Sequence, residues 1–216
     1  YVRKEDRYFL ITAAHILDTW GEKPIILGLP SNNIEILIPA IKSKSRRQDH
    51  QDDPLDIAVF PLNGHFHLNF MGLDSLPLED YTGEPILFPI EHLFAYGYLS
   101  SKLNVDFRES EYDIPPLQYQ GAEITNNRVF QKVNANAAYN ILMSFSKKKS
   151  KSISKGSGYI PAPDPSGCSG GALFRIYGDS EDVLEMMIFE GILTDVFRGD
   201  IQAMKALKKA KIREFL

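Results

Sequence analysis

The chain has 216 residues, with 24 lysines and arginines against 28 aspartates and glutamates, which gives a formal net charge of −4 at pH 7. Apolar residues make up 44% of the sequence and aromatic residues 11%. This is too much for an intrinsically disordered chain and enough for one hydrophobic core or two small ones. No apolar run approaches the roughly 18 residues that a membrane-crossing helix needs, so we expect a folded protein without a membrane span.

The chain contains a single cysteine, Cys168, which has no second cysteine with which to form an internal disulfide. Secreted proteins of this kind usually carry several cysteines, so we expect a reducing compartment and a cytoplasmic location. The sequence begins with Tyr1 and shows no charged and then apolar signal segment. We therefore expect the natural N-terminus to lie upstream of this chain.

Short segments rich in β-branched and aromatic residues recur along the chain and are typical of strands. Turn formers separate them, including Asp53-Pro54 and Asn63-Gly64, and the chain has 13 prolines and 15 glycines. This pattern predicts an all-β barrel or sandwich, with a second sheet in the C-terminal half. The expected strands comprise residues 8–12, 34–38, 57–60, 94–99, 139–145, 171–177 and 183–196.

Two further segments differ from this pattern. Residues 204–216 place Met204, Leu207 and Phe215 near one face of a helix with lysines opposite, which predicts a C-terminal α-helix. Residues 146–155 contain five lysines and no acidic residue, which predicts a mobile surface loop. No aromatic residue interleaves with these lysines and the whole chain is acidic, so a nucleic-acid partner is not favoured.

The segment Ser-Gly-Cys-Ser-Gly-Gly-Ala-Leu, from Ser166 to Leu173, is the most informative motif. It places Ser169 among glycines, which allow unusual backbone angles and close approach of a substrate. A serine can attack an acyl group when a base takes its proton, an acid orients the base and two backbone N–H groups stabilise the oxyanion. A nucleophilic Ser169 would therefore need a histidine and an aspartate elsewhere in the chain.

Both partners occur upstream of the serine. His15 follows an expected strand and two alanines, which leave space beside its imidazole, and Asp56 begins the expected strand at residues 57–60. Asp52 and Asp53 are alternatives to Asp56, but they precede a proline in an expected turn. The order along the chain is histidine, aspartate, serine.

The motifs Thr-Ala-Ala-His, Asp-Ile-Ala and Gly-x-Ser-Gly-Gly, in this order, resemble those of the chymotrypsin-like (trypsin-like) serine peptidases, and the likeness spans nearly the whole chain. The resemblance implies that Ser169 is the nucleophile, His15 the general base and then acid, and Asp56 the group that fixes the imidazole tautomer. It implies an oxyanion hole made by the amides of Gly167 and Ser169. No cofactor and no metal are implied.

The same resemblance implies an all-β fold of two six-stranded antiparallel β-barrels with the triad between them and a C-terminal helix. Residues 1–80 would form the first lobe, 81–92 a linker, 93–203 the second lobe and 204–216 the helix. The first strand of the family is missing or shortened at this N-terminus. Cys168 stands where secreted relatives carry an aspartate that pairs with a new N-terminus, so the nearest likeness is to bacterial intracellular or defence-associated members.

The resemblance also suggests which residues contact the substrate. In the family, residues several places before the nucleophile line the pocket for the side chain that precedes the scissile bond. Asp164 in that stretch could recognise a basic side chain, whereas an alignment shifted by one residue puts Pro163 there. The segment Phe189–Ile192 resembles the strand beside the substrate, which makes Glu190 and Gly191 candidates.

Other nucleophiles and ligands are less favoured. Viral relatives use a cysteine nucleophile, but at the position that Ser169 holds here, so Cys168 is expected to pack in the interior. A metal site could involve His50, His65, His67 or His92, yet no cysteine or further carboxylate completes a ligand set.

The sequence therefore predicts a serine endopeptidase that cleaves a protein or peptide substrate through an acyl-enzyme. The alternative is a pseudo-protease or latent module that acts by protein binding until an activating protein partner orders its cleft.

Overall fold

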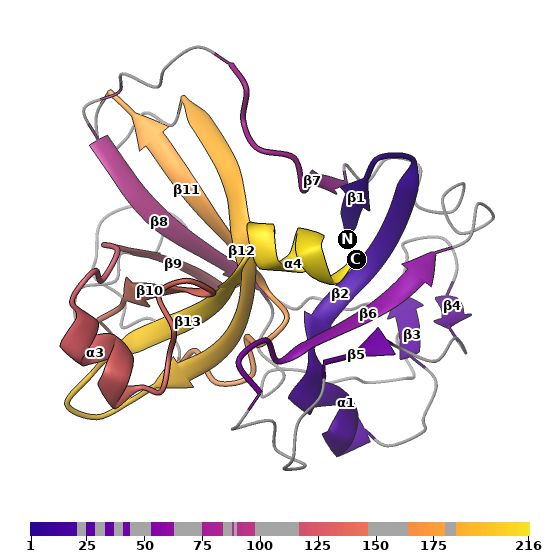
Figure 1. Cartoon of the computed structure of the whole chain (residues 1–216), viewed down its shortest axis with the longest axis horizontal. Coiled ribbons are helices and arrows are strands. Elements are labelled where there is room, and N and C mark those ends of the chain that lie inside the picture. The colour runs from indigo at the N-terminus through magenta and orange to yellow at the C-terminus, as the bar shows by residue number, and fades with distance from the viewer. Residues whose placement is uncertain are drawn as a thin grey trace, which may run out of the picture. The chain divides into compact units, whose positions relative to one another are not determined.

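The computed structural model describes residues 1–20, 25–28, 33–36, 41–43, 53–62, 75–83, 88, 90–97, 117–146, 164–179 and 185–216. These residues are mostly β and belong to two compact units, Tyr1–Leu78 and Glu79–Leu216 (Figure 1). None of the helices in the described ranges is long and apolar enough to cross a membrane.

The first unit contains a five-stranded sheet with the order β5-β6-β2-β1-β7. Its centre is the antiparallel pair β2 and β6, in register from Tyr8↔Leu62 to Ala13↔Ile57. Side chains of β2 alternate between buried and partly exposed, as a half-buried strand requires. The elements are β1 (Val2–Lys4), β2 (Arg7–Ala13), α1 (Ala14–Trp20), β3 (Ile25–Gly28), β4 (Asn33–Ile36), β5 (Ile41–Lys42), β6 (Ile57–Leu62) and β7 (Leu76–Pro77).

The described residues of the first unit do not confirm the expected six-stranded antiparallel β-barrel. Strand β1 pairs with β7 in parallel, through Val2↔Leu76 and Arg3↔Pro77. Strands β3 and β4 form a separate two-stranded sheet. The strands expected at residues 8–12 and 57–60 are confirmed, and β4 overlaps the strand expected at residues 34–38.

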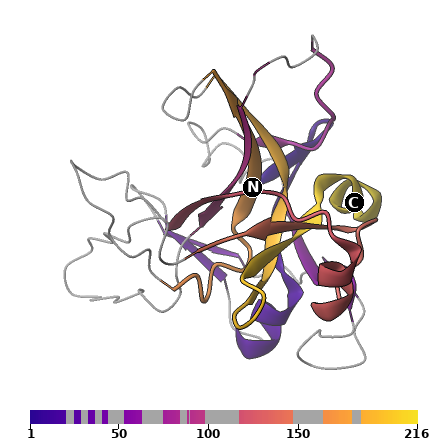
Figure 2. The same cartoon turned by 90° about the vertical axis from the view of Figure 1, so that its left-hand side faces the viewer.

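The second unit contains a six-stranded sheet with the order β10-β13-β12-β11-β8-β9, in which every neighbouring pair is antiparallel. The sheet is strongly curled, and Figure 2 shows the curl from a second direction. The expected strands at residues 94–99, 139–145, 171–177 and 183–196 all find a counterpart. The elements are β8 (Ile90–Gly97), β9 (Leu117–Gly121), α3 (Asn127–Lys132), β10 (Asn140–Ser144), β11 (Ala172–Gly178), β12 (Met186–Phe197), β13 (Ala203–Lys208) and α4 (Lys209–Phe215).

The curl brings the two edges of this sheet together just after β9. The amide of Ser144 donates to the carbonyl of Ala122 at 2.9 Å, and the amide of Ile124 donates to the carbonyl of Leu142 at 2.8 Å. A Cβ atom at Gly121 would lie 1.9 Å from the Ser144 carbonyl oxygen. Only glycine therefore permits the backbones to approach this closely.

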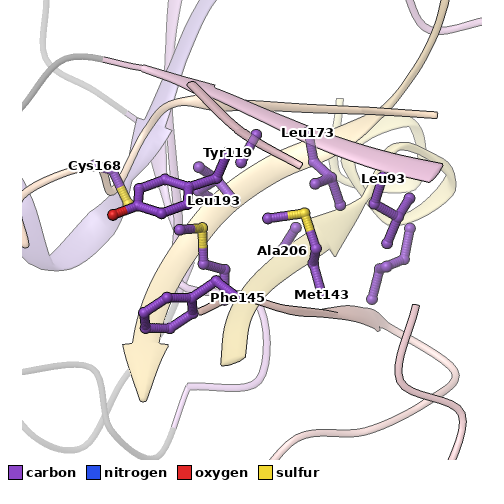
Figure 3. Packing of buried hydrophobic residues seen from close by; sticks show 11 residues of the cluster. Leu93, Tyr119, Met143, Phe145, Cys168, Leu173, Leu193 and Ala206 are labelled. Atoms are coloured by element: carbon purple, nitrogen blue, oxygen red, sulfur yellow. The ribbon is translucent and has the colours of Figure 1, made fainter. Parts of the chain in front are cut away.

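The interior of the curled sheet is the main core of the second unit (Figure 3). All six strands contribute buried side chains to it, and Tyr119 packs edge-on against Phe145 with ring centroids 5.8 Å apart. The remaining members are Leu93, Ala95, Ile141, Met143, Cys168, Leu173, Leu193, Met204 and Ala206.

The expected helix at residues 204–216 is wrong for its first five residues. Residues 203–208 form β13, which pairs with β10 on one side and β12 on the other, and only Lys209–Phe215 is helical. Met204, Ala206 and Leu207 are buried, so ladder bonds on both sides and burial outweigh the helix preference of an Ala-, Leu- and Lys-rich segment. A short C-terminal helix is confirmed.

Candidate active site

The local structure around His15 follows from the end of strand β2. Ala13 and Ala14 are fully buried, and the Ala14 amide donates to the Asp56 carbonyl at 3.0 Å. Helix α1 begins at Ala14, so His15 lies in its first turn, beside the residue that precedes β6. The side chain of His15 is 32% exposed.

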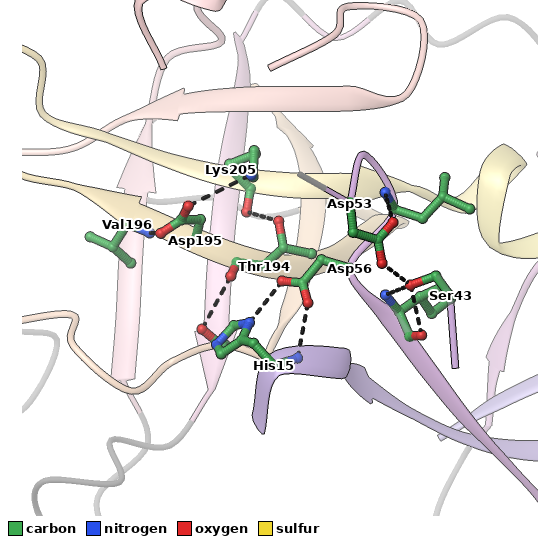
Figure 4. Close-up of polar contacts among 11 residues, drawn as sticks. His15, Ser43, Asp53, Asp56, Thr194, Asp195, Val196 and Lys205 are labelled. Atoms are coloured by element: carbon green, nitrogen blue, oxygen red, sulfur yellow. Dashed lines mark hydrogen bonds and ion pairs between the residues drawn. The ribbon is translucent and has the colours of Figure 1, made fainter. Parts of the chain in front are cut away.

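The Asp56 carboxylate holds His15 at two points (Figure 4). Oδ2 lies 2.8 Å from the imidazole Nδ1, and Oδ1 accepts the His15 backbone N–H at 3.0 Å. A carboxylate that is ionised only accepts hydrogen bonds, so this contact requires a proton on Nδ1, and in a neutral imidazole the lone pair then lies on Nε2. Asp56 itself has φ of +44°, a left-handed conformation that aspartate and asparagine tolerate better than most residues.

A second carboxylate, Asp53, has a different role in the structure. It is buried, accepts a hydrogen bond from Ser43 Oγ and accepts the Leu55 amide at 2.9 Å. Ser43 Oγ in turn accepts the Ile57 amide at 2.9 Å. Asp53 thus fixes the turn that precedes β6, while Asp56 contacts His15; Asp52 lies outside the described residues.

Ser169 lies in a tight turn that glycines shape. Gly167 and Gly170 have φ of +81° and +86°, where a side chain would be strained. The Cys168 amide donates to the Pro165 carbonyl at 3.2 Å, and the Gly171 amide donates to the Cys168 carbonyl at 2.9 Å. These bonds close two successive turns around the serine.

Strand β12 anchors this turn. The Gly170 amide donates to the Leu193 carbonyl at 2.7 Å, and the Leu193 amide donates to the Gly171 carbonyl at 2.7 Å. The hydroxyl of Ser169 lies 3.3 Å from the Thr194 carbonyl oxygen. The ladder between β12 and β13 pairs Leu193 and Asp195 with consecutive residues, so Thr194 is the extra residue of a β-bulge.

Thr194 is therefore the strand residue beside the serine, and the sequence did not reveal it. Its side chain is buried, and its hydroxyl lies 3.4 Å from the Lys205 carbonyl. A bulge inserts one extra residue into a strand and so changes which side chains and carbonyls face the neighbouring strand. The order of apolar and polar residues in the sequence does not show where this happens. The only available signal was a threonine directly after the apolar residues Ile192 and Leu193.

The amides of Gly167 and Ser169 were the expected oxyanion-hole donors. Neither amide donates a hydrogen bond to another residue within the described ranges, whereas the Cys168 amide between them does. Donors that bind a developing oxyanion must be held in place without an internal acceptor. As far as the described residues extend, the amides of Gly167 and Ser169 meet this requirement.

Cys168 points into the core of the second unit. It is 1% exposed and packs among the interior side chains of the curled sheet (Figure 3). Burial raises the pKa of the Cys168 thiol to about 11 and the pKa of the neighbouring Tyr119 hydroxyl to about 12. The thiol is therefore protonated at neutral pH and is a poor nucleophile.

Asp164 is engaged within the chain. Its Oδ1 accepts the Ser166 amide at 3.0 Å and the Ser166 hydroxyl, and it lies 3.2 Å from Nη2 of Arg198. Pro163, the alternative pocket residue, lies outside the described part of the chain, as do Lys147 to Lys155.

The described contacts of Glu190 and Gly191 lie within the six-stranded sheet. Gly191 pairs with Leu173 on one side and Lys208 on the other, and a Cβ atom there would lie 1.9 Å from the Leu207 carbonyl oxygen. Glu190 pairs with Arg175 at 3.2 Å. Strand β12 contacts the Ser169 hydroxyl at Thr194, and substrate contacts of Glu190 and Gly191 stay a prediction.

The described residues contain no group of three histidine, cysteine or carboxylate side chains that could hold a metal ion. His92 lies on β8. His50, His65 and His67 belong to the ranges that are not described.

Comparison of the sequence with models of known protein families gives no match, and comparison with curated proteins gives none either.

Proposed function

We propose that the protein is a serine endopeptidase in which Ser169 is the nucleophile, His15 the general base and Asp56 the residue that orients His15. The observation that carries the proposal is the double hydrogen bond from His15 to Asp56, at 2.8 Å and 3.0 Å. It holds the ring, and with an ionised Asp56 and a neutral imidazole it favours the tautomer with the proton on Nδ1 and the basic lone pair on Nε2. This is the protonation state that a general base for a serine requires.

The turn around Ser169 supports the same assignment. It presents a partly exposed serine between two glycines with positive φ, and the flanking amides of Gly167 and Ser169 have no acceptor among the described residues. A buried, protonated Cys168 leaves Ser169 as the nucleophile of this motif.

The proposed reaction begins when Ser169 Oγ attacks the carbonyl carbon of a peptide bond and its proton passes to Nε2 of His15. The Asp56 carboxylate stabilises the imidazolium that forms, and the amides of Gly167 and Ser169 bind the oxyanion. Breaking the C–N bond transfers that proton to the amine leaving group. Water then attacks the acyl-enzyme with His15 again acting as base, which releases the acid and restores Ser169. The proposal requires that Nε2 of His15 reach Ser169 Oγ.

The proposal includes a chymotrypsin-like architecture, with each unit as a barrel lobe. The curled antiparallel sheet of the second unit is compatible with such a lobe. We also propose that the first unit, Tyr1–Leu78, forms a complete barrel.

Labelling with a fluorophosphonate probe, followed by mass spectrometry of the modified peptide, tests this function. We expect an adduct on Ser169 in the wild type and in Cys168→Ala, and none in Ser169→Ala. When the three proteins are given the same peptide library, the wild type and Cys168→Ala should cleave peptides and Ser169→Ala should not. An adduct on another residue, or cleavage by Ser169→Ala, would refute the assignment. No adduct on a folded wild type would favour a latent or pseudo-protease module that acts by binding protein.

A further inference from the structure

Strand β8 ends against the turn that carries Ser169. Along the face of this strand that points into the core, the residues become smaller toward that end, from Leu93 to Ala95 and then Gly97. Side chains on one face of a strand recur at every second residue, so a side chain at Gly97 would point inward as well. The serine turn takes the space that such a side chain would need.

The contact at this point joins two glycines. The ladder between β8 and β11 ends at the pair Tyr96↔Ala172, and Gly171 lies beside Gly97 one residue further on. A Cβ atom at Gly97 would lie 3.3 Å from the Gly171 Cα and 3.6 Å from the Cys168 carbonyl oxygen. Carbon atoms that are not bonded to each other prefer about 3.5 to 4.0 Å, so the turn would have to move by a few tenths of an ångström to admit a methyl group.

Gly171 connects this contact to the reactive serine. Its amide donates to the Cys168 carbonyl at 2.9 Å. That carbonyl and the Ser169 amide belong to the same planar peptide group. A displacement of Gly171 therefore moves the Ser169 amide, which is one of the two proposed oxyanion donors.

Strand β12 limits how the turn can yield. The Leu193 carbonyl accepts the Gly170 amide, and the Leu193 amide donates to the Gly171 carbonyl, both at 2.7 Å. A shift of the turn away from Gly97 must therefore strain these two short hydrogen bonds or reorient the peptide group between Cys168 and Ser169.

We infer that Gly97 is a positioning residue for Ser169, because the absence of a side chain there lets the serine turn lie against the end of β8 and so sets the place of the Ser169 amide. This inference rests on the proposed function. Gly97 acts through Gly171 and the Cys168 carbonyl. Gly171 itself is a poor probe, because a Cβ atom there would lie 2.6 Å from the Tyr96 carbonyl oxygen and 2.9 Å from that of Cys168. Gly97→Ala requires only a small shift and is the informative variant.

The test measures fluorophosphonate labelling of Ser169 over a range of probe concentrations in the wild type, Gly97→Ala and Gly199→Ala. Gly199→Ala is the matched control, since the same methyl group has no atom within 4 Å there. Gly97→Ala should lower the limiting rate of labelling by about tenfold or more, because the donors for the phosphonyl oxygen are displaced, and should change the probe concentration at half-maximal rate by less than about twofold.

The control should keep both constants at their wild-type values. A glycine that served only the fold would behave differently from this expectation. Its replacement would lower the free energy of unfolding, measured in urea, and leave the limiting rate of the folded Gly97→Ala protein unchanged.

The backbone amide signal of Ser169 in ¹H–¹⁵N correlation spectra separates this inference from the proposed function, because it requires no catalysis. The signal should move in Gly97→Ala and keep its wild-type position in Gly199→Ala. A wild type that is not labelled, together with a signal that moves as expected, would reject the proposed function and leave the placement of Ser169 by Gly97 supported.

Two results for Gly97→Ala would overturn the inference while the wild type is labelled. The first is an unchanged limiting rate or an unchanged Ser169 amide signal in the folded variant. The second is a variant that does not fold, since Gly97 would then serve the fold and not the placement of Ser169.

Discussion

The carboxylate of Asp56 holds His15 by both of its oxygens, one on Nδ1 at 2.8 Å and one on the backbone amide at 3.0 Å. Each contact constrains a different part of the residue. The backbone bond fixes where α1 begins, and the side-chain bond fixes the imidazole tautomer. A single carboxylate therefore couples the local fold to the proposed chemistry.

Asp56→Asn should lower the rate of fluorophosphonate labelling by roughly a hundredfold or more, because the amide NH₂ would donate to Nδ1 and favour the wrong tautomer. Asparagine tolerates the positive φ and retains an oxygen for the His15 amide, so folding should persist. Asp53→Asn serves as the matched control. It should lower the free energy of unfolding but keep most of the labelling rate; equal losses of rate in both variants would contradict the separate roles of the two residues.

Arg175 is the centre of a second charged network, with Glu91, Glu123 and Glu190 as partners. Burial by itself lowers the pKa of its guanidinium, but the hydrogen bond to Glu123 and the charges of the carboxylates raise the pKa overall. The Arg175 side chain is 15% exposed, whereas the Glu91, Glu123 and Glu190 side chains are 50%, 36% and 21% exposed, so its loss would leave three partly exposed carboxylates without their shared cation.

Arg175→Met should lower the free energy of unfolding at pH 7 by on the order of 2 kcal/mol, between the values typical of exposed and buried pairs. The carboxylates of Glu91, Glu123 and Glu190 would then face one another without their shared cation. Urea unfolding of both proteins at pH 7 measures the loss. A free energy of unfolding equal to that of the wild type would contradict the stabilising role of the network.

Gly191 is expected to tolerate no side chain, because a Cβ atom would lie 1.9 Å from the backbone oxygen of Leu207. Gly191→Ala should lower the free energy of unfolding by about 3 kcal/mol or more, since β12 and β13 would have to separate. Gly199→Ala is the control, with φ of +152° but open space around the added atom, and should cost about 1 kcal/mol. Thermal or urea unfolding of both variants checks the difference, and similar losses would show that the ladder can adjust.

The buried thiol of Cys168 should lower the free energy of unfolding as the pH rises above about 9. Its pKa in the folded state is raised to about 11, so between about pH 9 and pH 11 the unfolded chain releases a proton that the folded protein keeps, and stability falls as the pH rises. The free energy of unfolding should therefore drop more steeply in the wild type than in Cys168→Ala over this range. Parallel curves for the two proteins would indicate that the thiol is not shielded as described.

The sequence predicted most of the strands because their β-branched and aromatic runs are bounded by turn formers, as in β2, β6 and β11. It favoured Asp56 over Asp53 because Asp56 adjoins an apolar strand. In the structure, Asp56 directly precedes β6 and its carboxylate contacts His15. It failed at residues 204–208, where pairing with strands distant in the chain decides the structure. The bulge at Thr194 and the pairing of Asp164 with Arg198 likewise depend on contacts that local patterns do not encode.

The central claim is that His15 activates Ser169, and the most direct test is the second-order rate of fluorophosphonate labelling at Ser169 in the wild type and in His15→Ala. The account predicts a fall of roughly a hundredfold or more in the variant, with an unchanged circular dichroism spectrum and thermal transition. Equal labelling rates in two folded proteins would contradict it, because Ser169 would then react without His15 as its base.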